Sequence, residues 1–155
     1  MTERDVTRML ARYADALHEW RLEDWADFFT DDGRYEIIPR ENLEGLAAGI
    51  TPLGIISCPD RRFIDDRVQA IRKATIYGPQ VYRHLFGNVV ADELGACRTA
   101  VRANYAVYRT TPPGEAELFS VGRPEAPVVD GDPARFSSLR FVCDALIPGY
   151  IVLPL

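Results

Sequence analysis

The residue best suited to proton-transfer chemistry is His84, which stands between aromatic and basic neighbours in a segment with strand-like composition. An imidazole titrates near neutral pH, so on a strand that faces an enclosed pocket it could act as a general base. Such a base needs a carboxylate partner, and Asp32 and Asp65 are the candidates. The alternative is that His84 only makes hydrogen bonds within the strand layer or at a subunit interface.

The other acidic pairs have a simpler explanation. Glu23-Asp24 and Asp31-Asp32 fall at the start of a short helical pattern and at a turn, where acidic residues are favoured for capping alone. His18 falls on the polar side of the first helical pattern, and we expect it to be solvated. We therefore interpret these groups as structural.

Metal chemistry is limited by the ligands that the sequence contains. An iron–sulfur cluster or a structural zinc ion needs closely spaced Cys or His pairs, whereas this chain has three separated cysteines and two histidines. His18 and His84 could join one carboxylate in a mononuclear site, but neither has a ligand at short spacing. We expect no metal-binding and no cofactor-binding residues, and reduced thiols rather than disulfides.

Composition excludes two classes of partner. The chain has 155 residues, with 18 basic and 23 acidic side chains and a formal net charge of −5, so the clustered positive charge that nucleic acid requires is missing. The charged start of the chain runs directly into a helical pattern, and no apolar run approaches the roughly twenty residues that cross a membrane. We expect one cytoplasmic domain over residues 1–155.

Apolar residues at spacings of three and four predict an amphipathic helix over residues 3–20. A second short helix follows from Leu22, and the sequence Thr30-Asp31-Asp32-Gly33 predicts a turn before a strand over residues 34–39. Residues 40–58 mix Gly, Pro and small apolar residues without a period and suggest an irregular excursion. A helix with its apolar side on Ile64, Val68 and Ile71 begins at Pro59 and ends near residues 78–79.

The rest of the chain is strand-like. Residues 98–107 alternate apolar and polar side chains, and turn sequences at 111–114 and 130–133 separate this strand from residues 117–123 and from a strand that starts at Arg135. Helices at one end of the chain and antiparallel strands at the other predict an α+β domain in which a curved sheet wraps over the helices.

The last six residues, Tyr-Ile-Val-Leu-Pro-Leu, read as an apolar strand that must be covered by something. A neighbouring chain could cover it, and the alternative is a final strand in the chain's own sheet. The polar side of the strand over residues 98–107 could likewise hold acidic groups of a partner. We expect these residues at an interface: Arg83, His84, Arg98, Arg102, Tyr150, Leu153 and Leu155.

Several motifs together resemble the beta, or small, subunits of bacterial aromatic-ring-hydroxylating dioxygenases over nearly the whole chain. They are Tyr13 with Trp20, Leu22-Glu23-Asp24-Trp25, Phe28 to Gly33, Asp66-Arg67-Val68, Tyr82-Arg83-His84-Leu85 and Arg140-Phe141-Val142-Cys143-Asp144. Within that family, Gly45 to Ile50 and the closing Leu153-Pro154-Leu155 look most like terephthalate dioxygenase small subunits.

The resemblance implies a cystatin-like cone, the NTF2-like or SnoaL-like fold shared with scytalone dehydratase and ketosteroid isomerase. It also implies a structural subunit with no catalytic residue. The Rieske [2Fe-2S] cluster and the mononuclear iron would then lie in a separate alpha subunit, in an assembly of three alpha and three beta chains that includes a beta trimer. The alternative is a free-standing dehydratase or isomerase of this fold that uses His84 with Asp32 or Asp65.

Two departures from the family pattern bear on the substrate. Pro124 follows Gly122-Arg123 where the family usually has an aromatic residue, and Ser138-Leu139 stands where a charged pair is common. These differences leave the subunit class intact and weaken an assignment of the exact substrate.

Overall fold

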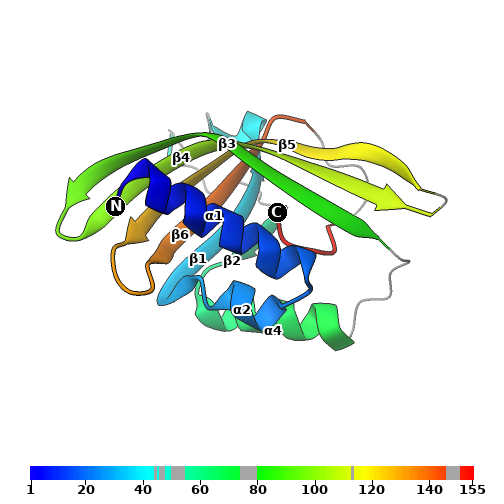
Figure 1. Ribbon diagram of the computed structural model, residues 1–155, viewed down its shortest axis with the longest axis horizontal. Helices are drawn as coiled ribbons and strands as arrows, with labels where there is room; N and C mark the ends of the chain where they lie inside the picture. The colour runs from blue at the N-terminus through cyan, green and yellow to red at the C-terminus, as the bar shows by residue number, and fades with distance from the viewer. Residues whose placement is uncertain (44, 46–47, 50–54, 74–79, 113, 146–150) are drawn as a thin grey trace.

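A curved six-stranded sheet dominates the computed structural model (Figure 1), which describes residues 1–43, 45, 48–49, 55–73, 80–112, 114–145 and 151–155. The strands lie in the order β2-β1-β6-β5-β4-β3. Strands β3 to β6 pair antiparallel in succession, β1 pairs parallel with β6, and β2 pairs antiparallel with β1. Their bounds are β1 Phe29–Pro39, β2 Ile56–Cys58, β3 Val81–Gly95, β4 Arg98–Thr111, β5 Glu115–Val129 and β6 Arg135–Cys143.

The helices cover one face of this sheet. Helix α1 (Glu3–His18) crosses the strands, while α2 (Leu22–Ala26) and α4 (Arg61–Lys73) lie together at the end near β1 (Figure 1). A 3-10 turn, η1 (Arg40–Asn42), follows β1. The α+β architecture predicted from the sequence is therefore confirmed.

The core lies between the helices and the inner face of the sheet. Strand β4 alternates buried and exposed residues along most of its length, as its sequence predicts. Aromatic side chains fill the space between the layers, and many of them meet edge to face. The largest fully buried ones are Trp25, Tyr13, Tyr35, Phe29, Phe119, Phe136 and Phe141.

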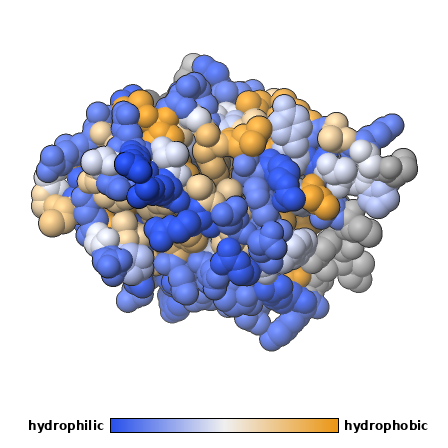
Figure 2. All heavy atoms as spheres, viewed as in Figure 1, coloured by the Kyte–Doolittle hydropathy of each residue, from blue (hydrophilic) through white to orange (hydrophobic). Residues whose placement is uncertain are grey.

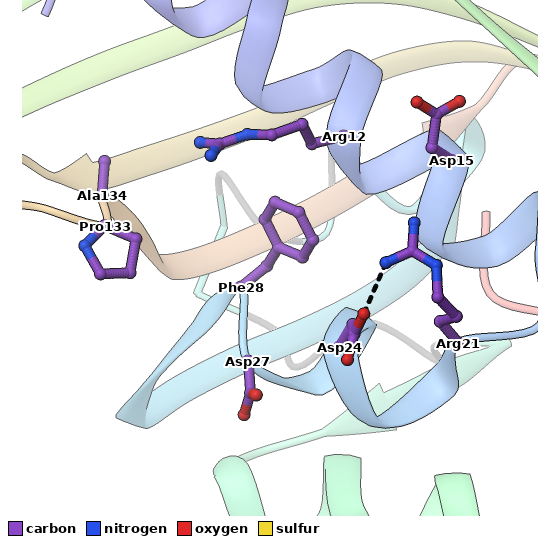
Figure 3. A pocket seen from close by; sticks show the side chains of 8 residues that line it. All are labelled: Arg12, Asp15, Arg21, Asp24, Asp27, Phe28, Pro133 and Ala134. Atoms are coloured by element: carbon purple, nitrogen blue, oxygen red, sulfur yellow. Dashed lines mark hydrogen bonds and ion pairs between the residues drawn. The ribbon is translucent and has the colours of Figure 1, made fainter.

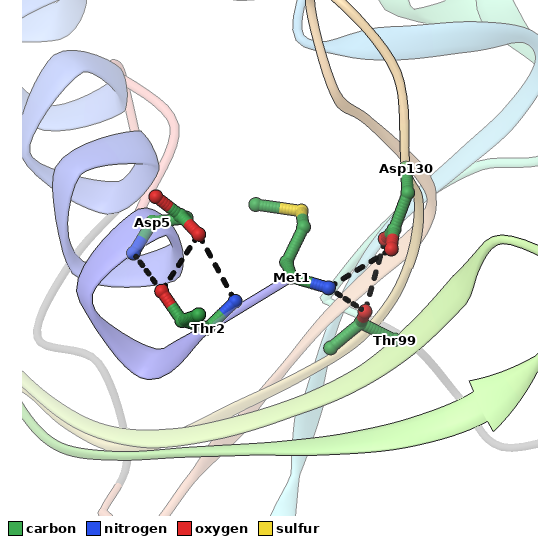
Figure 4. A network of polar contacts seen from close by, with 5 residues as sticks. All are labelled: Met1, Thr2, Asp5, Thr99 and Asp130. Atoms are coloured by element: carbon green, nitrogen blue, oxygen red, sulfur yellow. Dashed lines mark hydrogen bonds and ion pairs between the residues drawn. The ribbon is translucent and has the colours of Figure 1, made fainter.

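The start of α1 is fixed by polar contacts (Figure 4). Thr2 and Asp5 form a reciprocal capping box, which satisfies backbone donors that have no partner within the helix. The nitrogen of Met1 donates to Asp130 Oδ2 at 2.9 Å and to Thr99 Oγ1 at 3.0 Å. These contacts join the start of the helix to β4 and to the loop between β5 and β6.

Two predicted boundaries are wrong. Residues 30–33 form no simple turn, because β1 already begins at Phe29, which pairs with Phe136, and a bulge absorbs the residues before Arg34. Helix α4 begins at Arg61 rather than at Pro59, since the Asp60 carboxylate accepts from the backbone of the first turn. The predicted end of this helix near residues 78–79 lies outside the described residues.

Two further segments differ from expectation. The excursion over residues 40–58 contains β2, whose three residues are too few to produce an alternating pattern. The predicted final strand is wrong for Ile151–Leu155, which have no regular secondary structure. They are nevertheless largely buried within the fold of the chain itself.

Candidate functional site

His84 points from β3 into the space under α1 and is 5% exposed. Its Nε2 atom lies 3.1 Å from the carbonyl oxygen of Pro154. A carbonyl oxygen can only accept, so Nε2 carries the hydrogen. The backbone N–H of His84 donates to Nε2 of His18 at 2.9 Å, and the same His18 atom lies 3.2 Å from His84 Nδ1. His18 is therefore half-buried and bonded, and the prediction that it is solvated is wrong.

Burial keeps both imidazoles neutral. Desolvation lowers the pKa of His84 to about 3, although its bond to Pro154 acts in the opposite direction. Desolvation and the nearby charge of Arg83 lower the pKa of His18. A neutral imidazole whose Nε2–H is bonded to a backbone carbonyl holds the structure together, and among the described residues no carboxylate is bonded to it to orient it for proton transfer.

The two predicted carboxylate partners lie elsewhere. Asp32, on β1, accepts from the hydroxyl of Thr30 at 2.8 Å. Asp65, on the exposed side of α4, pairs with Arg61 at 2.9 Å. Within the described ranges, neither is bonded to His84, so the acid–base pair required by the dehydratase or isomerase alternative is not assembled.

The two histidines meet, as a metal site would need, but without further ligands. Among the described residues no group of three or more His, Cys, Asp or Glu side chains could hold a metal ion.

The three cysteines are free, with Cys58 and Cys143 buried and Cys97 exposed. Tyr105 binds Cys143 and Ser120 in a buried cluster, with its hydroxyl 2.8 Å from the serine oxygen.

The segment Ile151–Leu155 is held from four sides. Arg67 on α4 donates to the carbonyls of Ile151 and Val152 at 3.3 and 3.4 Å, and His84 binds the carbonyl of Pro154. Tyr35 on β1 accepts from the N–H of Leu155 at 2.9 Å, and Tyr13 on α1 donates to its carbonyl. Sequence reasoning did not propose these two tyrosines as site residues.

This arrangement changes the interpretation of three predicted interface residues. Leu153 and Leu155 are 2% and 1% exposed in the isolated chain, because the core of the chain itself covers them, so they have no surface to offer a partner. Tyr150 lies outside the described residues. His84 is likewise buried inside the chain.

The remaining predicted interface residues lie on the outer face of the sheet, away from α1. Arg83, Arg98 and Arg102 alternate with inward-facing residues on β3 and β4. Arg102 pairs with Asp92 at 3.0 Å in the exposed layer. This confirms the polar outer side of β4, while a role at an interface stays a prediction.

Beside these charges lies an outer apolar patch, defined by Val81, Leu85, Tyr108 and Leu118. Strand pairing places Tyr108 opposite both Arg83 and Leu118, so the patch spans β3, β4 and β5. Its members are 52%, 58%, 41% and 50% exposed. In Figure 2, separate groups of hydrophobic atoms lie among hydrophilic ones in the upper half of the view.

A groove of about 280 Å³ opens between α1, α2 and residues Pro133–Ala134 (Figure 3). The ring of Phe28 and the side chain of Arg12 lie within it, and the ion pair between Arg21 and Asp24 lies at its rim. None of the site residues predicted from the sequence lines this groove. Its mixed charges indicate no single ligand.

Comparison with known proteins assigns the family. The family model described as "Ring hydroxylating beta subunit" matches residues 12–134. The chain belongs to the family of ring-hydroxylating dioxygenase beta subunits. It is accordingly a small subunit of a multicomponent aromatic-ring dioxygenase, in which the alpha subunit carries catalysis. The family prediction from the sequence motifs is confirmed.

Two relatives in this dioxygenase family share much of the sequence. The anthranilate 1,2-dioxygenase small subunit of Burkholderia cepacia is 36% identical over 144 residues, which cover 90% of this chain and 85% of the relative. Terephthalate 1,2-dioxygenase subunit beta 1 of a Comamonas species is 30% identical over 159 residues, covering 100% and 99%. The predicted similarity to terephthalate dioxygenase subunits is present, but the anthranilate subunit has the higher identity.

Solved structures agree with the fold of this dioxygenase subunit. A chain from Novosphingobium aromaticivorans, assigned as the beta subunit of an aromatic-ring-hydroxylating dioxygenase, superposes with a TM-score of 0.85 at 28% identity, covering 97% and 94% of the two chains. A protein of the same organism assigned as a scytalone dehydratase gives a TM-score of 0.71 at 15% identity, covering 96% and 87%, and so shares the fold alone. The predicted NTF2-like cone is confirmed.

Proposed function

We propose that this beta subunit carries no catalytic centre and supports the assembly of its alpha subunits, as a beta trimer within a hexamer of three alpha and three beta chains. The Rieske cluster and the mononuclear iron would both lie in the alpha chains. The family match over residues 12–134 is the observation that carries this proposal. The bonded, neutral state of His84 supports it, since the group best suited to catalysis is used in packing.

The outer apolar patch is the surface we propose for contact between chains. Monomeric proteins rarely expose a large contiguous apolar patch, whereas lasting interfaces bury such surface in their centres. Four exposed apolar side chains on adjacent strands, with Arg83 opposite Tyr108, have this composition. Arg98 and Arg102 would then form a polar rim, where ion pairs set orientation more than affinity.

The names of two relatives support a proposal for the substrate class. The two named above are subunits of dioxygenases that act on anthranilate and on terephthalate, both aromatic carboxylates. We propose that the assembled enzyme dihydroxylates an aromatic carboxylate such as these. We also propose a reducing, cytoplasmic location, which the three free cysteines support. None of the described helices is long and apolar enough to span a bilayer.

Co-expression with the cognate alpha subunit tests the assembly role. Size-exclusion chromatography and iron analysis of the purified material should give a large iron-containing complex and an iron-free beta subunit when it is purified alone. A beta subunit that stays monomeric in the presence of the alpha subunit would contradict the proposal.

Substitutions then test the surface. Leu85→Asp and Leu118→Asp should each weaken assembly at least tenfold without altering the circular dichroism spectrum, because a buried unpaired charge is costly at an interface centre. Leu94→Asp is the matched control, since Leu94 is 59% exposed near the far end of β3. Equal assembly by all three variants would exclude the outer apolar patch as the contact surface.

A further inference from the structure

The interior of the cone contains four polar side chains that each form a hydrogen bond with the backbone of the segment Ile151–Leu155. Arg67, His84, Tyr13 and Tyr35 come from α4, β3, α1 and β1, and each bonds to a backbone atom of this segment. The segment itself belongs to no strand or helix. Its displacement would therefore remove no strand of the sheet and no turn of a helix.

These side chains present mainly donors. Arg67, His84 and Tyr13 donate to carbonyl oxygens, and only Tyr35 accepts. The Nε atom of Arg67 is buried and has no hydrogen-bond partner among the described residues. Such a set is matched by a molecule with several acceptor oxygens on one side, because a donor without a partner in a buried site is costly.

Arg67 brings a positive charge close to the interior of the cone. Within the described part of the chain, Arg67 takes part in none of the ion pairs. Its positive charge acts on the interior, because it lowers the pKa of Tyr35 and of Cys58, whereas burial raises both pKa values. A partly buried guanidinium without a carboxylate partner favours an anion, and its planar fork matches a carboxylate. The surrounding walls are aromatic and apolar, and they include Trp25 and Phe141.

We propose that the space filled by Ile151–Leu155 is a latent pocket for a small aromatic or apolar carboxylate, and that this segment is its occupant within the chain. The carboxylate would take the donors of Arg67 and Tyr13, and its apolar body would replace the side chains of Leu153 and Leu155. The proposal concerns this chain alone and does not depend on its role in assembly.

A chain that ends at residue 150 tests the pocket. Circular dichroism first establishes that it folds, and 2-naphthoate is then titrated while its fluorescence is followed. We expect saturable one-to-one binding to the shortened chain and binding at least tenfold weaker to the full chain, whose pocket is occupied. The neutral analogue 2-naphthamide should bind the shortened chain at least tenfold more weakly than the anion.

Two substitutions in the shortened chain separate a specific site from general exposure of apolar surface. Arg67→Gln should weaken 2-naphthoate binding at least tenfold. Arg62→Gln is the matched control on the same helix, where the side chain is 85% exposed, and it should leave binding unchanged. The proposal would be overturned if the shortened chain folds but does not bind 2-naphthoate saturably. It would also be overturned if the two substitutions had equal effects on binding.

The shortened chain could also be unfolded on its own. In that case the peptide Ile-Val-Leu-Pro-Leu, added as a separate molecule, should restore the native spectrum, and 2-naphthoate should do so at higher concentration. Failure of both would show that the segment is ordinary core. Restoration by the peptide alone would overturn the assignment of a small carboxylate ligand.

Discussion

The backbone N–H of His84 donates to the imidazole of His18, so a side chain of α1 satisfies a donor on the edge strand β3. An edge strand otherwise presents unpaired N–H groups that invite pairing with other chains. The same imidazole nitrogen lies 3.2 Å from His84 Nδ1. Because it accepts from the backbone of His84, this nitrogen of His18 carries no hydrogen, and the His18 ring is neutral in this arrangement.

This pair makes stability depend on pH. In the unfolded chain His84 binds a proton near its ordinary pKa of 6.5, whereas in the folded chain its pKa is about 3. The unfolded state therefore takes up a proton first as the pH falls, and stability is lost between about pH 6.5 and pH 3. At pH 5 the loss from His84 is about 2 kcal/mol relative to pH 7. His18, whose pKa is also lowered, adds to it in the same direction.

Urea unfolding at pH 7 and pH 5 measures this loss. His84→Gln keeps an N–H donor for the Pro154 carbonyl and removes the titrating group, so its stability should change less between the two pH values. Hydrogen bonds lower the pKa of Asp5, Asp60 and Asp130 from the ordinary value of 3.8, so these carboxyl groups titrate below the interval between pH 5 and pH 7. An unchanged pH dependence in His84→Gln would contradict the assignment.

Tyr35→Phe should destabilise the chain by about 1–3 kcal/mol, because the N–H of Leu155 then lies buried without an acceptor. Burial of the Tyr35 hydroxyl raises its pKa, so it is a neutral partner at all ordinary pH values. Tyr108→Phe is the control, since Tyr108 is 41% exposed and its substitution should stay within about 0.5 kcal/mol. Chemical denaturation of both variants gives the comparison.

Gly122→Ala should be more damaging than Gly87→Ala, although both glycines lie in strands. A Cβ atom at Gly122 would overlap the backbone carbonyl oxygen of Val142 on β6, whereas one at Gly87 meets nothing within 4 Å. We expect a cost of about 1–3 kcal/mol or more for the first substitution and little change for the second. A lower urea midpoint with an unchanged m value would show this. Equal midpoints would mean that β5 and β6 separate at little cost.

The fold could be predicted from the sequence where one pattern dominated. Val6, Leu10 and Leu17 on α1 and the alternation along β4 indicate buried faces directly, and those faces are buried. The predicted boundaries of helices and strands were wrong where tertiary contacts determine them. Phe29 belongs to β1 because it pairs with Phe136, which lies more than a hundred residues away in the sequence. No local pattern contains that pairing.

The site could be predicted less well, because its parts are distant in sequence. The pairing of His18 with His84 and the binding of Leu155 by Tyr13 and Tyr35 depend on how α1, β1 and β3 come together. The apolar character of the last residues was apparent from the sequence, and so was the need to cover them. That the chain's own core covers them required the structure.

The three thiols should differ in reactivity. Cys97 is exposed, while Cys58 and Cys143 are buried, and burial raises the pKa of both buried thiols and reduces their thiolate fraction. In the native chain, 5,5′-dithiobis(2-nitrobenzoate) should react rapidly with one equivalent of thiol, and Cys97→Ser should abolish this phase. In urea all three should react. Rapid reaction of two or more thiols in the native chain would show that the layer around Cys58 or Cys143 opens readily, contrary to the packing of Cys143 against Tyr105.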